Sequence, residues 1–184
     1  MPDGFIKEVS LMILVTLGTQ DKSFKRLLEK LEEELEKGKI KDEIIVQAGY
    51  TEFASNKMTI KKLIPMDEFD NLIEKCDILI THGGVGSIIT GLRKNKKVIA
   101  VARLKKYKEH TNDHQLQIID NFTKAGYILN LDDFDSISDA INEAKKFIPN
   151  KYVSNKDNFV KTVEGIIDDY LKLPEFGNFY FTKF

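Results

Sequence analysis

The chain has 184 residues, and its 28 Lys and Arg nearly balance its 29 Asp and Glu, for a formal net charge of −1. That length predicts one domain of ordinary size, and the balanced charge, with no mixed basic and aromatic stretch, argues against nucleic acid as a partner. A single cysteine excludes a disulfide framework, and no apolar run approaches the roughly 20 residues of a membrane span, so we expect a cytoplasmic protein.

The first half of the chain alternates short apolar runs with amphipathic segments. It predicts strands at residues 12–16, 43–47 and 59–64, a helix from Phe24 that stops at Gly38, and another that Asp67 caps and that runs to Cys76. Residues 1–11 show no such pattern. We treat them as an N-terminal extension and leave them out of the predicted fold.

The second half continues the alternation. Strands are predicted at residues 78–80, 98–102 and 127–131 with helices between them, followed by helices at 136–147 and about 160–171. Strands that alternate with helices predict an α/β domain over residues 12–172, with a Rossmann-like, doubly wound parallel sheet. Residues 173–184 form an aromatic tail, which suits either an interface with protein or membrane or packing on its own domain.

The most informative stretch joins the strand at 78–80 to the next helix and reads Thr81-His82-Gly83-Gly84-Val85-Gly86-Ser87. Its glycines let the backbone turn sharply and keep side chains away from the N–H groups, while the helix start adds a positive dipole end. Such a loop suits a phosphate or diphosphate, which the Ser87 hydroxyl and the His82 ring could also reach. The alternative is a loop that only makes a strand-to-helix turn.

The other two histidines of the chain, His110 and His114, fall together at the start of the helix that follows the strand at 98–102. Both polar stretches therefore follow the carboxyl ends of successive strands, where open parallel sheets bind ligands. Arg103, also at a strand end, could help hold a diphosphate. Because His110 and His114 are four residues apart and would share a helix face, a zinc site with Asp113 or His82 is an alternative.

Together these motifs resemble the C-terminal, donor-binding domain of family 28 glycosyltransferases, which is one half of the GT-B fold. The resemblance covers residue 12 to about 171 and depends on Leu17-Gly18-Thr19, on the loop from Thr81 to Ser87, and on Arg103, Glu109-His110 and Asp113-His114-Gln115. Within the family, the pattern is similar to that of two kinds of stand-alone subunit. These are the small subunit of the UDP-GlcNAc transferase that acts on dolichol-linked sugar and the bacterial exopolysaccharide β-1,4-galactosyltransferase subunits.

The resemblance implies a role for each matching residue. The amides of Gly84 to Ser87 would hold the donor diphosphate, with His82 nearby and Gly18 and Thr19 across the same pocket. His114 and Gln115 would face the sugar. Many members carry a glutamate that binds the ribose hydroxyls where this chain has Thr90 or Gly91, so Thr90 could make only one weaker hydrogen bond. The expected donor-binding residues are Gly18, Thr19, His82, Gly83, Gly84, Val85, Gly86, Ser87, Thr90, Arg103, Glu109, His110, His114 and Gln115.

The resemblance also implies an activity, the transfer of a hexose or N-acetylhexosamine from a UDP-sugar to a lipid-linked saccharide in glycan or exopolysaccharide synthesis. Amide dipoles and a helix N-terminus would stabilise the leaving UDP, so neither a metal nor another cofactor is required. The general base, which we leave unassigned, and the acceptor site are expected from a membrane-associated partner subunit that holds this chain at the membrane periphery. The alternative is a non-catalytic nucleotide-sugar-binding subunit that activates or stabilises a partner glycosyltransferase.

Overall fold

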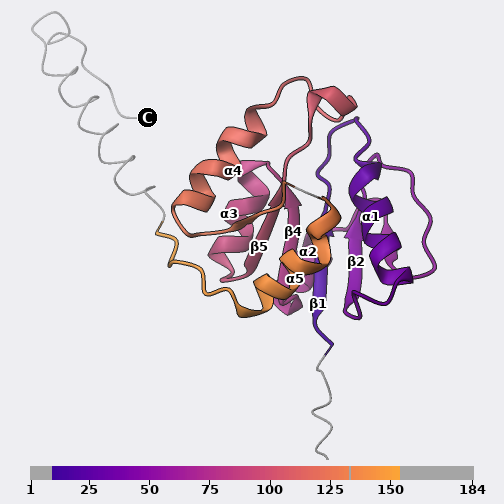
Figure 1. Cartoon of the computed structure of the whole chain (residues 1–184), viewed down its shortest axis with the longest axis horizontal. Coiled ribbons are helices and arrows are strands. Elements are labelled where there is room, and N and C mark those ends of the chain that lie inside the picture. Colours follow the sequence, from indigo (N-terminus) through magenta and orange to yellow (C-terminus); the bar gives the residue numbers. More distant parts are fainter. Residues whose placement is uncertain (1–9, 133, 154–184) are drawn as a thin grey trace, which may run out of the picture. The chain divides into compact units, whose positions relative to one another are not determined.

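The computed structural model describes residues 10–132 and 134–153, which form a six-stranded parallel sheet with covering helices (Figure 1). The strands lie in the order β3-β2-β1-β4-β5-β6, and all neighbours are parallel. Their bounds are β1 (Met12–Thr16), β2 (Glu43–Gln47), β3 (Thr59–Lys61), β4 (Ile78–His82), β5 (Lys97–Val101) and β6 (Leu129–Asn130). The predicted Rossmann-like α/β fold is confirmed.

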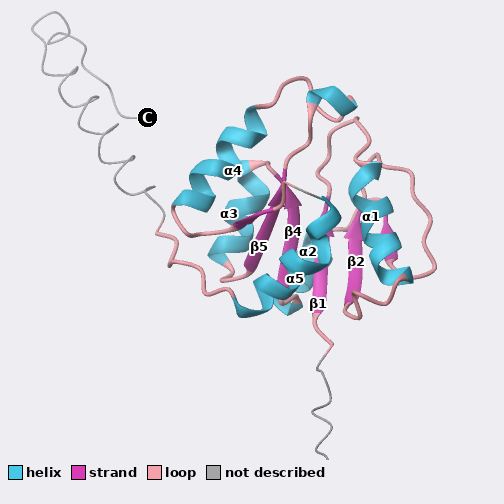
Figure 2. Ribbon diagram, in the orientation of Figure 1, coloured by secondary structure: helices cyan, strands magenta, loops and turns pink. Residues whose placement is uncertain are grey.

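Among the described residues, four α-helices connect strands and a fifth follows β6, and Figure 2 shows the helices around the sheet. They are α1 (Lys25–Glu36), α2 (Met66–Lys75), α3 (Val85–Arg93), α4 (His114–Lys124) and α5 (Ile137–Lys146), with 3-10 turns η1 (Lys105–Tyr107) and η2 (Phe134–Ser136). Gly38 and Gly126 follow α1 and α4 at a φ of 70°, a backbone conformation that glycine adopts without steric cost. None of these helices combines the length and apolar character needed to cross a bilayer.

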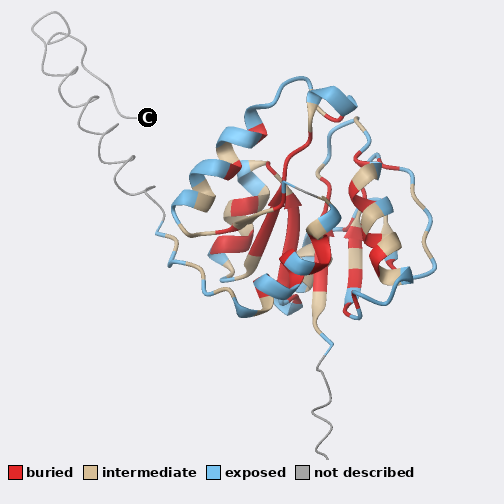
Figure 3. Cartoon of the chain, viewed as in Figure 1, coloured by how far each residue is buried: buried red, intermediate tan, exposed pale blue. Residues whose placement is uncertain are grey.

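The central strands are buried on both faces, which explains why they read as continuous apolar runs (Figure 3). Because successive side chains of a strand point to opposite faces, Ile13 and Val15 join the core cluster beneath α1 and α5. On the other face, Leu79 and Val98 lie against Gly91 of α3. The core therefore holds β1, β4 and β5 at fixed positions, and their carboxyl ends form a common edge.

Two predicted strands are shorter in the structure. β3 ends at Lys61. The carbonyl of Lys62 still accepts from Gly49 N–H at 2.8 Å, but the N–H of Ile64 donates to the Gln47 side chain, 3.1 Å away. The sixth strand was predicted at 127–131 but has only two residues, Leu129 and Asn130. The N–H of Tyr127 donates to the carbonyl of Phe122 in α4 and so does not join the sheet. The prediction that Asp67 caps α2 is wrong, because the helix begins at Met66 with Pro65 at the N-cap position, and Asp67 lies in its first turn.

The sequence predicts an extension at one end of the chain, and a last helix and an aromatic tail at the other. Leu11 packs against the core, and its N–H donates to the Asp42 carboxylate at 3.0 Å while its carbonyl accepts from Glu43 N–H. Residues 1–9, the helix predicted at 160–171 and the tail at 173–184 lie outside the described residues.

Gly91 lets α3 approach the sheet closely, so its substitution tests this packing. A Cβ at position 91 would lie 2.7 Å from Leu79 Cδ2 and 2.8 Å from Val98 Cγ2. We expect Gly91→Ala to lower the free energy of unfolding by about 1–3 kcal/mol, as overpacking does, although alanine favours helix by about 1 kcal/mol. Urea unfolding measures the change.

Gly86→Ala on the same helix is the matched control, because no atom lies within 4 Å of a Cβ at that position. This variant should be as stable as the parent or slightly more stable. Equal losses in the two variants would contradict the packing argument.

Candidate functional site

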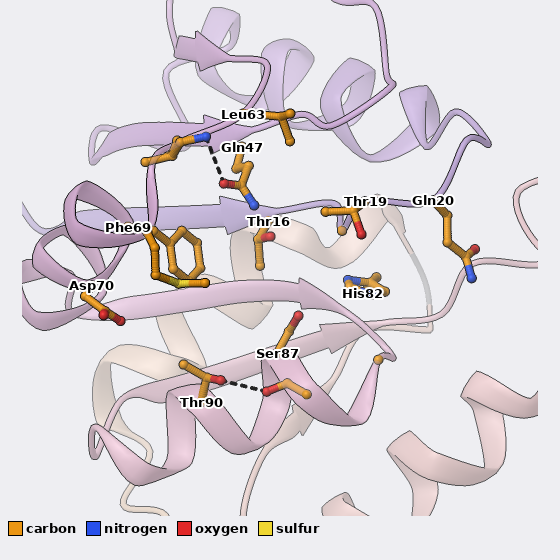
Figure 4. Close-up of a pocket in the computed structure, with 15 residues that line it drawn as sticks. Thr16, Thr19, Gln20, Gln47, Leu63, Phe69, Asp70, His82, Ser87 and Thr90 are labelled. Atoms are coloured by element: carbon orange, nitrogen blue, oxygen red, sulfur yellow. Dashed lines mark hydrogen bonds between the residues drawn. The ribbon is translucent and has the colours of Figure 1, made fainter.

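A pocket of about 610 Å³ opens at the carboxyl ends of β1 and β4 (Figure 4). These two strands are neighbours at the point where the strand order reverses direction, which is where open α/β sheets bind ligands. Three segments supply its walls: the end of β1 and its loop, the β2 end with the β3–α2 segment, and the β4–α3 turn. The lining residues are Thr16, Gly18, Thr19, Gln20, Gln47, Leu63, Ile64, Met66, Phe69, Asp70, His82, Gly84, Gly86, Ser87 and Thr90.

The first turn of α3 presents unpaired N–H groups at this pocket. Gly84 occupies the N-cap position, and no side chain caps the helix or places a carboxylate in its first turn. The N–H groups of the first helical residues, Val85 to Ser87, have no acceptor within the helix. The N–H groups of Gly83 and Gly84 are already used, by Gln115 Oε1 at 3.2 Å and by His82 O at 2.7 Å. An anion at this turn would therefore meet the amides of residues 85–87.

The His82 ring lies between two glycines from different loops. A Cβ on Gly18 would fall 2.7 Å from the ring carbon Cε1, and a Cβ on Gly84 would fall 2.5 Å from Nε2. Both distances are shorter than real Cβ contacts, so only glycine fits at either position beside this ring. Gly18 also has a φ of 79°, which disfavours any other residue. The imidazole thus fixes how the β1 loop and the β4–α3 turn approach each other.

Burial and then the positive charge of nearby Arg103 lower the pKa of His82 from 6.5 to about 4. The ring is therefore neutral at pH 7 and carries a single N–H, for which the backbone carbonyl of Thr16 competes with a ligand. Its Nδ1 lies 3.5 Å from the Thr81 hydroxyl. A neutral ring at an anion site adds a dipole and a hydrogen bond without a fixed charge.

Arg103 does not line the pocket but lies buried behind it, only 1% exposed. Its Nη1 donates to Lys22 O at 2.7 Å, and its Nη2 donates to Leu17 O. Glu109 is also buried and pairs with Arg26 at 2.9 Å. These two charged residues hold the loop after β1 rather than facing the pocket.

Gln115 and the two histidines near the start of α4 differ in how deeply they are buried. Gln115 is buried, and its Oε1 accepts from the N–H groups of Gly83 and Arg103 at 3.2 and 3.0 Å. His110 Nε2 lies 3.2 Å from the amide nitrogen of Gln20, which borders the pocket. His114 is exposed at the start of α4 and lies outside the pocket lining. Across residues 10–132 and 134–153, no three His, Cys, Asp or Glu side chains are grouped closely enough to hold a metal ion.

The structure thus brings seven of the expected site residues into one pocket, namely Gly18, Thr19, His82, Gly84, Gly86, Ser87 and Thr90. The structure also distinguishes positions 90 and 91, at one of which many similar proteins carry the glutamate that binds ribose. Thr90 lines the pocket, whereas Gly91 faces the sheet and has no room for a side chain. The Thr90 hydroxyl donates to Gly86 O at 2.8 Å, so it can only accept from a ligand.

Sequence reasoning missed the wall opposite α3. Gln47, Leu63, Met66, Phe69 and Asp70 line it, and Leu63 and Met66 are 60% and 76% exposed. A sequence signal was available for Gln47, because it ends a strand of the same parallel sheet, and open parallel sheets bind ligands at the carboxyl ends of their strands. The others belong to the β3–α2 segment, whose apolar residues fit a helix pattern equally well.

The strand order and the pocket at its reversal define a Rossmann-like domain of the kind that forms one half of GT-B glycosyltransferases. Solved structures of other proteins share this fold. The glycosyltransferase of kitacinnamycin matches with a TM-score of 0.57 and 19% identity over 78% of this chain and 36% of that one. The solution structure of ALG13 matches with a TM-score of 0.54 and 18% identity, over 83% of this chain and 94% of that one. MurG of Acinetobacter baumannii matches with a TM-score of 0.51 and 17% identity, over 76% of this chain and 41% of that one.

Residues 12–170 match the glycosyltransferase family 28 C-terminal domain, and the chain belongs to this family. Two relatives are named as the UDP-N-acetylglucosamine transferase subunit ALG13. The one from Candida albicans is 26% identical over 125 residues, 68% of this chain and 39% of the relative. The one from Candida glabrata is 44% identical over 55 residues, 29% of this chain and 25% of the relative. The matched region spans well under half the length of these relatives.

The depressed pKa of His82 gives a direct test of where an anion binds. The ring should titrate near pH 4 in the free chain. Bound pyrophosphate or UDP favours the imidazolium, so we expect the pKa of His82 to rise by about one unit or more and anion binding to tighten as the pH falls. NMR of the ring resonances at increasing pH, with and without UDP, measures the shift.

His114 serves as an internal control, because its exposed ring lies outside the pocket. Its resonances should not move on addition of UDP at constant pH. A His82 titration that UDP leaves unchanged would place the anion elsewhere.

Proposed function

We propose that this chain binds the donor in a glycosyltransferase that moves a hexose or N-acetylhexosamine from a UDP-sugar to a lipid-linked saccharide, in glycan or exopolysaccharide synthesis. The observation that carries the proposal is the uncapped first turn of α3, which faces a pocket at the strand reversal between β1 and β4. The relatives named as UDP-N-acetylglucosamine transferase subunits support the choice of UDP and of this sugar class.

The phosphate end of the pocket fits the needs of the leaving group. As the bond to the sugar breaks, negative charge develops on UDP, and the amides of Val85, Gly86 and Ser87 with the α3 dipole stabilise it. Ser87 adds a hydroxyl and the neutral His82 ring adds a dipole, and both side chains line the pocket. Because these groups are fixed before the reaction, the proposal requires no metal ion or other cofactor.

The other end of the pocket fits a pyrimidine nucleoside. Leu63, Met66 and Phe69 give an apolar wall against which a base can pack. Gln47 has its Oε1 occupied by the N–H of Ile64 at 3.1 Å, so its amide NH₂ group turns into the pocket (Figure 4). That group is a donor, which complements a carbonyl oxygen of uracil.

The acceptor side of the reaction is proposed to come from a membrane-associated partner subunit. A general base and a surface that orients the acceptor hydroxyl are both required for transfer. The pocket residues include one imidazole, that of His82, which is neutral but lies at the diphosphate end and not beside an incoming hydroxyl. We therefore assign no catalytic base to this chain and place it at the cytoplasmic face of a membrane, held there by the partner.

Calorimetric titration of the purified chain with UDP and UDP-sugars tests donor binding. We expect the parent chain to bind and Gly84→Asp to bind at least about tenfold more weakly, a loss of roughly 1.4 kcal/mol. The new side chain would collide with His82 Nε2 and set a negative charge beside the diphosphate.

Asn142→Asp on α5 is the matched control, since it adds the same charge at an exposed residue outside this pocket. It should bind UDP like the parent. Loss of binding in both variants would point to a general charge effect, and no binding by the parent would overturn the donor site.

A transfer assay tests the dependence on a partner. We expect the purified chain to transfer little or no sugar to a lipid-linked acceptor, because the acceptor side is missing, and the complex purified through a tag on this chain to be active. Release of product, followed by chromatography of the labelled lipid, measures this. Rapid transfer by the chain alone would contradict the proposed division of labour.

A non-catalytic role is the second candidate, in which the chain binds nucleotide-sugar and only activates or stabilises its partner. Thr90 favours it, because its hydroxyl is committed to Gly86 O. Gln115, expected to face the sugar, uses its Oε1 inside the protein. Gly84→Asp in the assembled complex abolishes transfer if this chain holds the donor, and leaves transfer unchanged if the chain only stabilises its partner.

A further inference from the structure

Asp70 is the one acidic residue among the described residues that line the pocket. Its side chain is exposed to solvent where it lines the pocket, and a carboxylate there opposes the binding of a diphosphate by charge repulsion unless it also contacts another part of the ligand. The carboxylate of Asp70 makes no ion pair or hydrogen bond within the part of the chain that the structure describes. The ammonium of Lys94 is close enough to interact with it electrostatically, but that group bonds to Glu74. Both oxygens of Asp70 are therefore available to a ligand.

The pocket has a direction, and Asp70 lies at a definite place along it. In Figure 4, His82 lies at one end, Ser87 in the middle, and Phe69 and Asp70 at the other end, with Thr90 below them. Ser87 and Thr90 are separated by about one turn of α3, or roughly 4.5 Å along its axis. If a diphosphate occupies the first turn, the ribose comes next along the nucleotide and lies beside Thr90 and Asp70.

The neighbouring groups cannot replace this carboxylate. Thr90 Oγ1 donates its hydrogen to Gly86 O at 2.8 Å, which leaves one weak acceptor. Gly91 cannot carry a side chain because Leu79 and Val98 fill the space. A ribose presents two adjacent hydroxyl donors, and a carboxylate with two free oxygens is the group that accepts both.

We infer that Asp70 accepts hydrogen bonds from the 2′ and 3′ hydroxyls of the bound nucleotide, so that this site selects ribonucleotides over 2′-deoxyribonucleotides. The inference rests on the proposed donor function. It assigns the ribose contact to α2, on the opposite wall of the pocket from α3. Selection arises because a deoxyribose leaves one lone pair of the carboxylate without a donor while the repulsion toward the diphosphate stays.

Titrations with UDP and 2′-deoxy-UDP test the inference. We expect the parent chain to bind UDP about tenfold more tightly than 2′-deoxy-UDP, and Asp70→Ala to reduce that ratio to within about threefold. The ratio is the correct measure, because removal of a negative charge by itself strengthens the binding of both nucleotides equally. Pyrophosphate, which has no ribose, should bind Asp70→Ala as well as or better than the parent.

Asp67→Ala is the matched control, since it removes an exposed carboxylate from the first turn of the same helix but does not line the pocket. It should keep the ratio of the parent. An unchanged ratio in Asp70→Ala, or a parent that binds both nucleotides equally, overturns the inference while UDP binding preserves the proposed function. A parent that binds neither nucleotide overturns both.

Discussion

A buried guanidinium, that of Arg103, holds together the loops on which the site depends. Its side chain bonds to the carbonyls of Leu17 and Lys22 after β1 and lies 3.4 Å from Glu109 O before α4. Desolvating a charge is costly, and these carbonyl dipoles offset much of that cost. The backbone N–H of Arg103 and that of Gly83 share Gln115 Oε1, which adds the β4–α3 turn to the same assembly. Three loops from three strands are thereby fixed by two side chains.

This arrangement divides the pocket into two parts of different character. At the phosphate end, backbone amides, two glycines and the partly buried His82 are held by the sheet and by the Arg103 assembly. At the nucleoside end, Leu63 and Met66 are largely exposed side chains of the β3–α2 segment. A rigid end suits a constant group such as a diphosphate, because no reorganisation is needed when charge develops. The exposed end has the freedom to adjust to the base.

The fold and one side of the pocket could be predicted from sequence because both have local signals. Apolar β-branched runs followed by glycine gave the ends of β1 and β4, and the expected loop residues Gly18, His82 and Ser87 do line one pocket. The part of the wall formed by Leu63 and Phe69 has no such signal, since its place depends on the register of β2 and β3 against β1. The burial of Arg103 was equally hidden, because a polar residue at a strand end looks the same whether it faces ligand or backbone.

The position of the His82 ring between Gly18 and Gly84 has an evolutionary consequence. The three residues form one steric unit, since a Cβ at either glycine would occupy the space of the ring. They are therefore not free to vary independently. A larger residue at position 84 becomes acceptable only after position 82 has lost its ring, and that change removes the imidazole from the site at the same time, whereas the φ of 79° favours glycine at position 18 in either case. Related sequences should change positions 82 and 84 together or keep both, and should keep glycine at position 18.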